Sequence, residues 1–297
     1  MISIIICSIN KTFAQQVQQN IAATIGVEWE AIVIDNTIAP KSITQVYNEG
    51  AAKARYDIVC FAHEDILFQT QNWGMKITDA FEADQNLGLI GVAGCKYKSK
   101  TPAGWFTGIK QFDCGNIKHF NRDSITETLY FNPEPGSLQQ QVVVVDGVFL
   151  CSPKRVWQQI QFDETLLKGF HLYDIDYSVR VAAKYTAMVT FEIDILHITK
   201  GNHFDNRWLN YTLIWHAHKK NQLPVISDDV TMNTQNVESR IVKGWLIRLK
   251  HEKLTMRNKI RWLYAVKIWQ HPVAWPNIPL FLINSMIPKK HVPASGK

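Results

Sequence analysis

Short apolar runs alternate with stretches of helical spacing along the N-terminal part of the chain. Runs with the length and β-branched composition of buried strands cover residues 2–7, 30–35, 58–61 and 87–93. Apolar residues recur every third or fourth position in the intervening segments 12–24, 41–56 and 72–83, which predicts a helix in each. Strands that alternate with helices indicate βαβ units, so we expect a mostly parallel sheet.

The regular alternation of predicted strands and helices ends at residue 95. Residues 95–141 are rich in Lys, Gly and Pro, and their aromatic residues follow no clear period. So long an irregular segment inside a compact domain is usually functional. The four valines at 142–145 then predict a buried strand that ends at Asp146-Gly147. A second run, 148–151, leads to Ser152-Pro153, which predicts a helix start with Pro at the first helical position.

The C-terminal part continues with a helix after Gly169, a strand over 187–193 and an amphipathic helix over about 206–219. The composition changes near 223–237, which is the best candidate for a linker. We therefore expect an α/β domain over residues 1–225 and a basic, amphipathic helical extension over residues 226–297.

Polar side chains capable of binding a cation or a proton follow several of these strands or open the helices after them. They are Asp35, His63, Glu64, Asp65, Asp146, Asp174 and His197. Right-handed crossovers place the ends of parallel strands at one edge of a sheet, so these groups should converge there. Carboxylates and imidazole gathered at one edge suit a divalent cation that keeps open positions for phosphate oxygens.

Several other site types are excluded by the sequence. It contains no Gly-x-x-x-x-Gly-Lys loop, no Gly-x-Gly-x-x-Gly after the first strand and no Gly-x-Ser-x-Gly elbow. Its five cysteines are irregularly spaced without a Cys-x-x-Cys pair, and we expect them to be free thiols in a reducing compartment. The remaining chemistry is metal-assisted and acts on a phosphorylated ligand, with one carboxylate available as a base.

Charge is unevenly distributed along the chain. Residues 238–297 contain 12 Lys/Arg and two acidic residues, whereas residues 1–237 contain 20 basic and 24 acidic residues. An apolar stripe at helical spacing runs through the basic segment from Val242 to Val266. It can pack on the domain, or it can meet anionic lipid with Trp262, Trp269 and Trp275 at the interface. No recognition motif accompanies the charge, so we expect no nucleic-acid partner.

The order of these motifs resembles the family 2 type of nucleotide-sugar glycosyltransferases with the GT-A fold, over roughly residues 1–200. The likeness rests on Ser3–Asn10, Val33–Asn36, Asn48–Ala54, His63–Asp65, and Phe162–Glu164 followed by Tyr173–Arg180. It implies a GT-A-like (Rossmann-like) sheet flanked by helices. It also implies a transferase that moves a sugar from a nucleotide-sugar donor to a hydroxyl of a glycan or lipid-linked acceptor, with inversion.

The resemblance also implies roles for individual residues. Asp174 matches the catalytic base, while Asp65 and His197 match ligands of Mn²⁺ or Mg²⁺. The expected nucleotide-sugar-binding residues are Ser8, Asn10, Asp35, Asn48, His63, Glu64, Asp146 and Gly147. Two positions depart from the family pattern. His63 replaces the first acid of the Asp-x-Asp motif, and Tyr173 replaces the glutamate that commonly precedes the base.

Structural alternatives stay open for each of these residues. Asp65 can be a strand-end cap, Asp35 an Asx turn, Asp174 a helix cap and His197 a satisfied core residue. At the level of function, a nucleotidyltransferase or phosphohydrolase could use the same metal edge, and an inactive membrane-associated scaffold could keep the fold. The first apolar run lacks the basic start of a signal peptide, and no apolar run reaches the length of a membrane span. We therefore expect a cytoplasmic protein, with the inner face of the cell membrane as a peripheral site.

Overall fold

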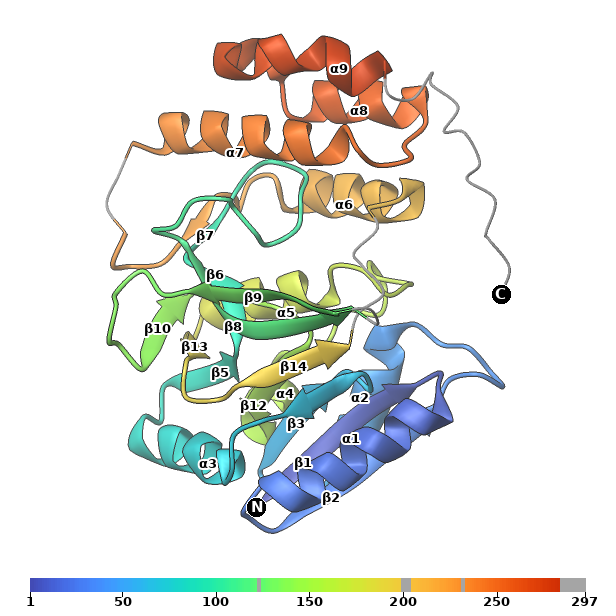
Figure 1. The fold of residues 1–297 in the computed structure, drawn as a ribbon, viewed down its shortest axis with the longest axis vertical. Helices are drawn as coiled ribbons and strands as arrows, with labels where there is room; N and C mark the ends of the chain where they lie inside the picture. The colour runs from blue at the N-terminus through green and yellow to red at the C-terminus, as the bar shows by residue number, and fades with distance from the viewer. Residues whose placement is uncertain (122–123, 199–203, 231–232, 284–297) are drawn as a thin grey trace.

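The computed structural model describes residues 1–121, 124–198, 204–230 and 233–283 (Figure 1). Its central sheet has the strand order β10 (Gln139–Val142), β13 (Thr186–Thr190), β5 (Leu87–Gly91), β12 (Phe149–Pro153), β3 (Ile58–Ala62), β1 (Ile2–Ser8) and β2 (Trp29–Asp35). β1 is parallel to β2 and β3, and β5 is parallel to β13. β12 runs antiparallel to β3 and β5, and β10 runs antiparallel to β13. The expectation of a mostly parallel sheet flanked by helices is confirmed.

Helices cover both faces of this sheet. They are α1 (Lys11–Thr24), α2 (Ile43–Lys53), α3 (Trp73–Ala83), α4 (Lys154–Gln159) and α5 (Tyr173–Ala182). Successive strand residues point to opposite faces. In β1, Ile5 therefore packs in the core that contains α2, α4 and α5, while Ile4 and Ile6 pack in the core that contains α1 and α3. The approach of α2 to the sheet needs a glycine, because a Cβ on Gly50 would lie 2.3 Å from a methyl carbon of Ile5.

The structure also contains a second sheet. Its order is β11 (Val144–Val145), β6 (Ala93–Cys95), β8 (Asp113–Asn121), β14 (Ile195–Ile198) and β4 (Ile66–Phe68), with β9 (Ser124–Phe131) paired to β8. The segment expected to be irregular thus contains a long hairpin. Polar residues and a glycine interrupt the apolar positions of β8, so it gives no period-two signal. The four valines are also divided: β10 ends at Val142 and β11 begins at Val144, in different sheets.

The C-terminal helices form a stack at one end of the molecule (Figure 1). They are α6 (Asn206–Lys219), α7 (Thr234–Leu249), α8 (Met256–Ala265) and α9 (Ile278–Ile283), with 3-10 turns at η1 (Ile268–Gln270) and η2 (Pro272–Asn277). The apolar stripe of α7 is buried against Tyr97 of β7 and Phe112, the residue before β8. Trp262 is fully buried, so for this residue the packing alternative holds and the lipid interface does not. Its buried indole N–H donates to the Pro102 carbonyl.

The segment 223–237, which was expected to be a linker, pairs with a strand of the α/β domain. β15 (Val225–Ile226) pairs with β7 (Tyr97–Lys98). Glu238 of α7 is buried and accepts hydrogen bonds from the Tyr97 hydroxyl, the Ser99 hydroxyl and the Lys100 amide. The division of the chain at residue 225 stays a prediction, and residues 284–297 of the expected extension lie outside the described residues.

The cysteines differ from the expectation of five free thiols. Cys60 of β3 and Cys151 of β12 lie opposite each other in adjacent antiparallel strands and form a disulfide. The pairing of β12 with β3 brings them together, and the sequence contains no signal for it. Among the described helices, none is long and apolar enough to cross a bilayer.

Candidate active site

A cavity of about 920 Å³ opens where β1, β2 and β3 end. Its walls come from the turns after these strands and from the segment before α5. The residues that line it include Cys7, Ile9, Asn10, Phe13, Asn36, Lys41, Ser42, Gln45, Tyr47, His63, Glu64, Asp65, Lys168, Gly169, Phe170, Ile198 and Arg207. Chain connections reverse direction between β1 and β3, and open α/β sheets bind ligands at such a point.

The turn from β1 into α1 forms one wall. The Asn10 side chain caps α1 by accepting from the amides of Thr12 and Phe13. The Glu64 carboxylate accepts from the amides of Ile9 and Asn10, at 3.2 and 3.1 Å. Glu64 therefore holds the β1–α1 turn beside the β3 end, and it lines the cavity at the same time.

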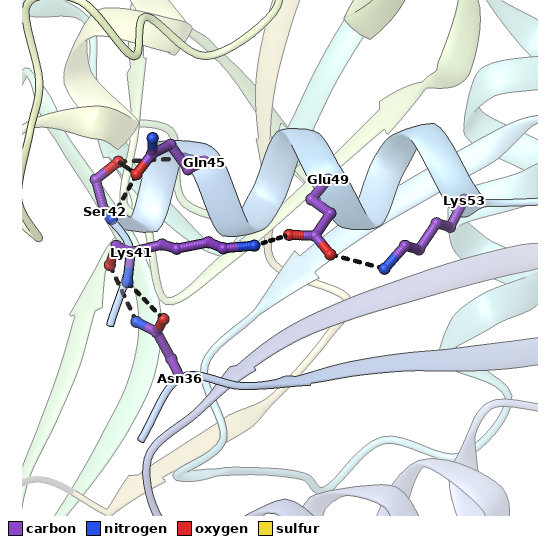
Figure 2. Close-up of polar contacts among 6 residues, drawn as sticks. All are labelled: Asn36, Lys41, Ser42, Gln45, Glu49 and Lys53. Carbon is purple, nitrogen blue, oxygen red and sulfur yellow. Dashed lines mark hydrogen bonds and ion pairs between the residues drawn. The ribbon is translucent and has the colours of Figure 1, made fainter. Parts of the chain in front are cut away.

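The loop from β2 into α2 forms a second wall of the cavity. Figure 2 shows the polar contacts of this loop. The Asn36 amide group both donates to and accepts from the backbone of Lys41, which closes the loop. Ser42 and Gln45 then make a reciprocal capping box at the start of α2. Lys41 and Lys53 both bind the Glu49 carboxylate, and their hydrogen bonds lower the pKa of Glu49 to about 2.

A cluster of two imidazoles and one carboxylate lies at the β3 end of the cavity. The Asp65 Oδ1 atom is 3.4 Å from His197 Nε2 and 3.9 Å from His63 Nδ1. His197 comes from a distant part of the sequence, but β14 pairs with β4, which begins directly after Asp65. Ligand atoms of the three residues all lie within 4.8 Å of one another. This is a donor set that suits a divalent transition metal such as Mn²⁺.

The protonation of this cluster favours metal binding. Burial lowers the pKa of His63, and the neighbouring His197 lowers it further, so the neutral ring that can ligate a metal is favoured. Burial acts to raise the pKa of Asp65, but His197 and His63 beside it together outweigh burial and hold the pKa below its usual value. His63 therefore presents a neutral nitrogen donor beside the ionised carboxylate of Asp65.

A second group of residues surrounds Asp174. The Asp146 carboxylate accepts from the Trp105 indole and the Val148 amide. The Gly147 amide donates to Asp174 Oδ2 at 3.0 Å. Burial, and then the charge of Asp146, raise the pKa of Asp174 to about 7. Burial and the second carboxylate thus outweigh the dipole of α5, which by itself favours an ionised carboxylate in the first turn.

Comparison with known proteins shows the family of this chain. A family model described as a glycosyltransferase-like family matches residues 3–240, well over half of the chain. The chain belongs to this glycosyltransferase family.

A solved structure shares this fold. The chain is similar to GalNAc-T7, solved with UDP, GalNAc and Mn²⁺, with a TM-score of 0.50 and 9% sequence identity. The alignment covers 72% of this chain and 47% of that chain, so this chain spans about half of GalNAc-T7. At such low identity the likeness shows the fold, and the GT-A-like expectation is confirmed. No curated protein matches the chain.

Three other predicted binding residues, Asp35, Asn48 and Ser8, lie outside the two groups. The exposed Asp35 forms the alternative Asx turn, with its Oδ1 accepting from the amide and hydroxyl of Thr37. Asn48 is buried, and its amide bonds the backbone of Phe162 and the side chains of Trp157 and Glu164. Ser8 is buried at the end of β1. Asp176, two positions after Asp174, is buried and pairs with Arg180 and Lys219.

Sequence reasoning missed several lining residues of the glycosyltransferase. Lys168 and Phe170 flank Gly169, and Arg207 lies in the first turn of α6. Lys168, Phe170 and Arg207 are all exposed. An aromatic residue next to a glycine was the signal available in the sequence, but only the fold brings this segment to the cavity.

Proposed function

We propose that the chain is a metal-dependent glycosyltransferase that moves a sugar from a nucleotide-sugar donor to a hydroxyl of a glycan or lipid-linked acceptor. The proposal rests mainly on one observation. The His63–Asp65–His197 cluster lies at the wall of the cavity formed by the ends of β1, β2 and β3. GalNAc-T7, which shares the fold, binds UDP, a sugar and Mn²⁺. A role in polysaccharide biosynthesis belongs to the same proposal.

His63, Asp65 and His197 would hold the divalent cation, Mn²⁺ or Mg²⁺. When bound, the cation supplies positive charge that stabilises a diphosphate leaving group. The cavity supports the binding of such a donor in other ways. Lys168 and Arg207 place two exposed cations on its wall, which suits a negatively charged ligand.

Asp174 would take the proton from the acceptor hydroxyl. Its pKa of about 7 matches the requirements of a base that works near neutral pH, because such a group is partly ionised and still basic. One base acting on one acceptor is consistent with single-step attack opposite the leaving group, and therefore with inversion. The Gly147 amide would hold the carboxylate in place through its bond to Oδ2.

Thermal denaturation with a panel of nucleotide sugars tests this function. We expect one donor class to raise the melting temperature in the presence of Mn²⁺ and to lose this effect with a chelator. A ligand at a hundred times its dissociation constant stabilises a protein by about 2.7 kcal/mol.

Product analysis then separates the alternatives. Release of a nucleoside diphosphate supports sugar transfer, whereas release of pyrophosphate or phosphate supports a nucleotidyltransferase or phosphohydrolase. Binding without turnover of any donor and acceptor pair supports an inactive scaffold.

We further propose that the helical stack meets an anionic membrane, where a lipid-linked acceptor would lie. Exposed apolar residues gather on consecutive elements of the stack, namely Tyr264, Trp269, Val273, Trp275 and Leu280. One of the two acidic residues in 238–297, Glu238, is buried and bonded to the body. Exposed cations therefore prevail at this end of the molecule, and aromatic rings with basic neighbours suit a lipid interface.

Vesicle binding tests the membrane proposal on the full chain. We expect binding to vesicles with anionic lipid and release as salt is raised, because salt screens the attraction. Insertion of about 60 Å² of apolar ring contributes about 1.5 kcal/mol, so Trp269→Ala or Trp275→Ala should weaken binding about tenfold. Met75→Ala is the control, because Met75 is exposed on α3 at the opposite end of the molecule. Equal binding by all three variants would contradict the proposal.

A further inference from the structure

Tyr173 lies between the two groups of the site. It is the first residue of α5 and is almost fully buried. Its hydroxyl lies 2.9 Å from His63 Nε2 on one side and 3.0 Å from the Gly147 carbonyl oxygen on the other. The residue before it, Leu172, has a positive φ of 66°, a conformation that costs energy for a branched side chain. The backbone is therefore held in an unfavourable conformation where it presents Tyr173 and Asp174.

The single hydroxyl hydrogen of Tyr173 decides how His63 is protonated. A backbone carbonyl can only accept, so Tyr173 donates its hydrogen to the Gly147 oxygen. The Tyr173 oxygen must then accept from His63, which places the imidazole hydrogen on Nε2. The other nitrogen, Nδ1, consequently carries a lone pair.

This lone pair lies on the side of Asp65. Nδ1 of His63 is 3.9 Å from Asp65 Oδ1, too far for a hydrogen bond, and neither atom carries a hydrogen to share. Two lone-pair donors that face each other at this separation suit a cation that binds both. The partner of the remote nitrogen usually fixes the tautomer of a ligating histidine.

We propose that Tyr173 is a positioning residue that holds His63 in its metal-binding tautomer and links the metal cluster to the turn that holds Asp174. The inference rests on the metal site of the proposed function. Gly147 completes the link, because its carbonyl accepts from Tyr173 and its amide donates to Asp174. A Cβ on Gly147 would lie 2.2 Å from the Tyr173 hydroxyl, so the contact requires a glycine.

Tyr173→Phe tests the inference, with Tyr177→Phe as the matched control. Tyr177 lies one turn later in α5, is fully buried and donates to the Ser152 hydroxyl away from the cluster. Each variant removes one buried hydroxyl. We expect Tyr173→Phe to weaken Mn²⁺ binding by about tenfold or more, measured by electron paramagnetic resonance of free Mn²⁺. Tyr177→Phe should bind Mn²⁺ as the wild type does.

The tautomer itself can be observed without metal and without activity. In the metal-free wild type, ¹⁵N resonances of His63 should show a hydrogen on Nε2 and none on Nδ1. A hydrogen on Nδ1 would overturn the inference even if Tyr173→Phe fails to fold. In folded Tyr173→Phe, loss of the acceptor should produce a mixture of both tautomers.

The outcomes separate this inference from the proposed function. A wild-type protein that binds no Mn²⁺ overturns the metal site and the inference together. Wild-type binding that is unchanged in Tyr173→Phe overturns the inference alone and leaves the metal site standing. Equal weakening in both variants also overturns it, because that result assigns the effect to packing of α5.

Discussion

Asp174→Asn should lower turnover by about 10²- to 10⁴-fold while donor and Mn²⁺ binding survive. The amide keeps the shape of the carboxylate but cannot accept the acceptor's proton. Asp174 is separate from the His63–Asp65–His197 cluster, so the metal ligands remain in place. The measurement is kcat beside the dissociation constants of the donor and of Mn²⁺. Joint loss of turnover and binding would contradict the role of Asp174 as a base.

The raised pKa of Asp174 also predicts how activity and stability depend on pH. Activity of the wild type should rise with pH through about 7, because the base must be ionised. The free energy of unfolding should instead fall as pH rises. The carboxyl binds its proton more tightly in the folded state, so its ionisation destabilises the fold as pH rises from about 4 to 7. Asp174→Asn should therefore raise the melting temperature at pH 8 and change it little at pH 4.

Asp176→Asn is the control for this variant. Asp176 is buried two positions later and contacts the Arg180 guanidinium, the Lys219 ammonium and the Trp215 indole. Removal of one member of a buried ion pair costs about 3–5 kcal/mol. We expect Asp176→Asn to lower stability and to leave turnover per folded molecule near that of the wild type. A stable, inactive Asp176→Asn beside an active Asp174→Asn would reverse the two roles.

Asp65→Ala should abolish Mn²⁺ binding and reduce turnover by about 10²-fold or more. Asp65 Oδ1 is the atom within 4 Å of both imidazoles, so the variant removes the only negative ligand of this cluster. Stabilisation of a leaving group by a metal is worth several kcal/mol, and about 1.4 kcal/mol corresponds to tenfold. Addition of a chelator to the wild type should reproduce the effect.

Calorimetric titration with Mn²⁺ and then with the donor measures this prediction. Asp79→Ala serves as the control, because Asp79 is an exposed carboxylate on α3 away from the cavity. Its affinities should equal those of the wild type. Donor binding by Asp65→Ala that is unchanged, both with and without the chelator, would show that Asp65 holds no metal.

Local patterns in the sequence predicted much of the fold. The apolar runs of β1, β2 and β3 and the helices between them follow from periodicity, which depends on neighbouring residues alone. The polar residues after β3 marked the place of the cavity, because the ends of parallel strands share an edge. The spacing of apolar residues gave no strand at β8 and a single strand at the four valines, and the structure differs at both places. There the pairing of distant strands decides which residues form a strand.

Charge and hydrogen bonding were decided only by the tertiary structure. A position in the first turn of a helix favours an ionised Asp174, but burial and Asp146, 28 residues earlier, raise its pKa. Glu64 is bound to the amides of the β1–α1 turn through contacts more than 50 positions apart. Tyr173 looked like a substitution in a motif until its hydroxyl was found between His63 and Gly147. The sequence determined which chemical groups are present at this edge of the sheet. Their protonation and partners depend on distances across separate elements, and these exist only once the chain is folded.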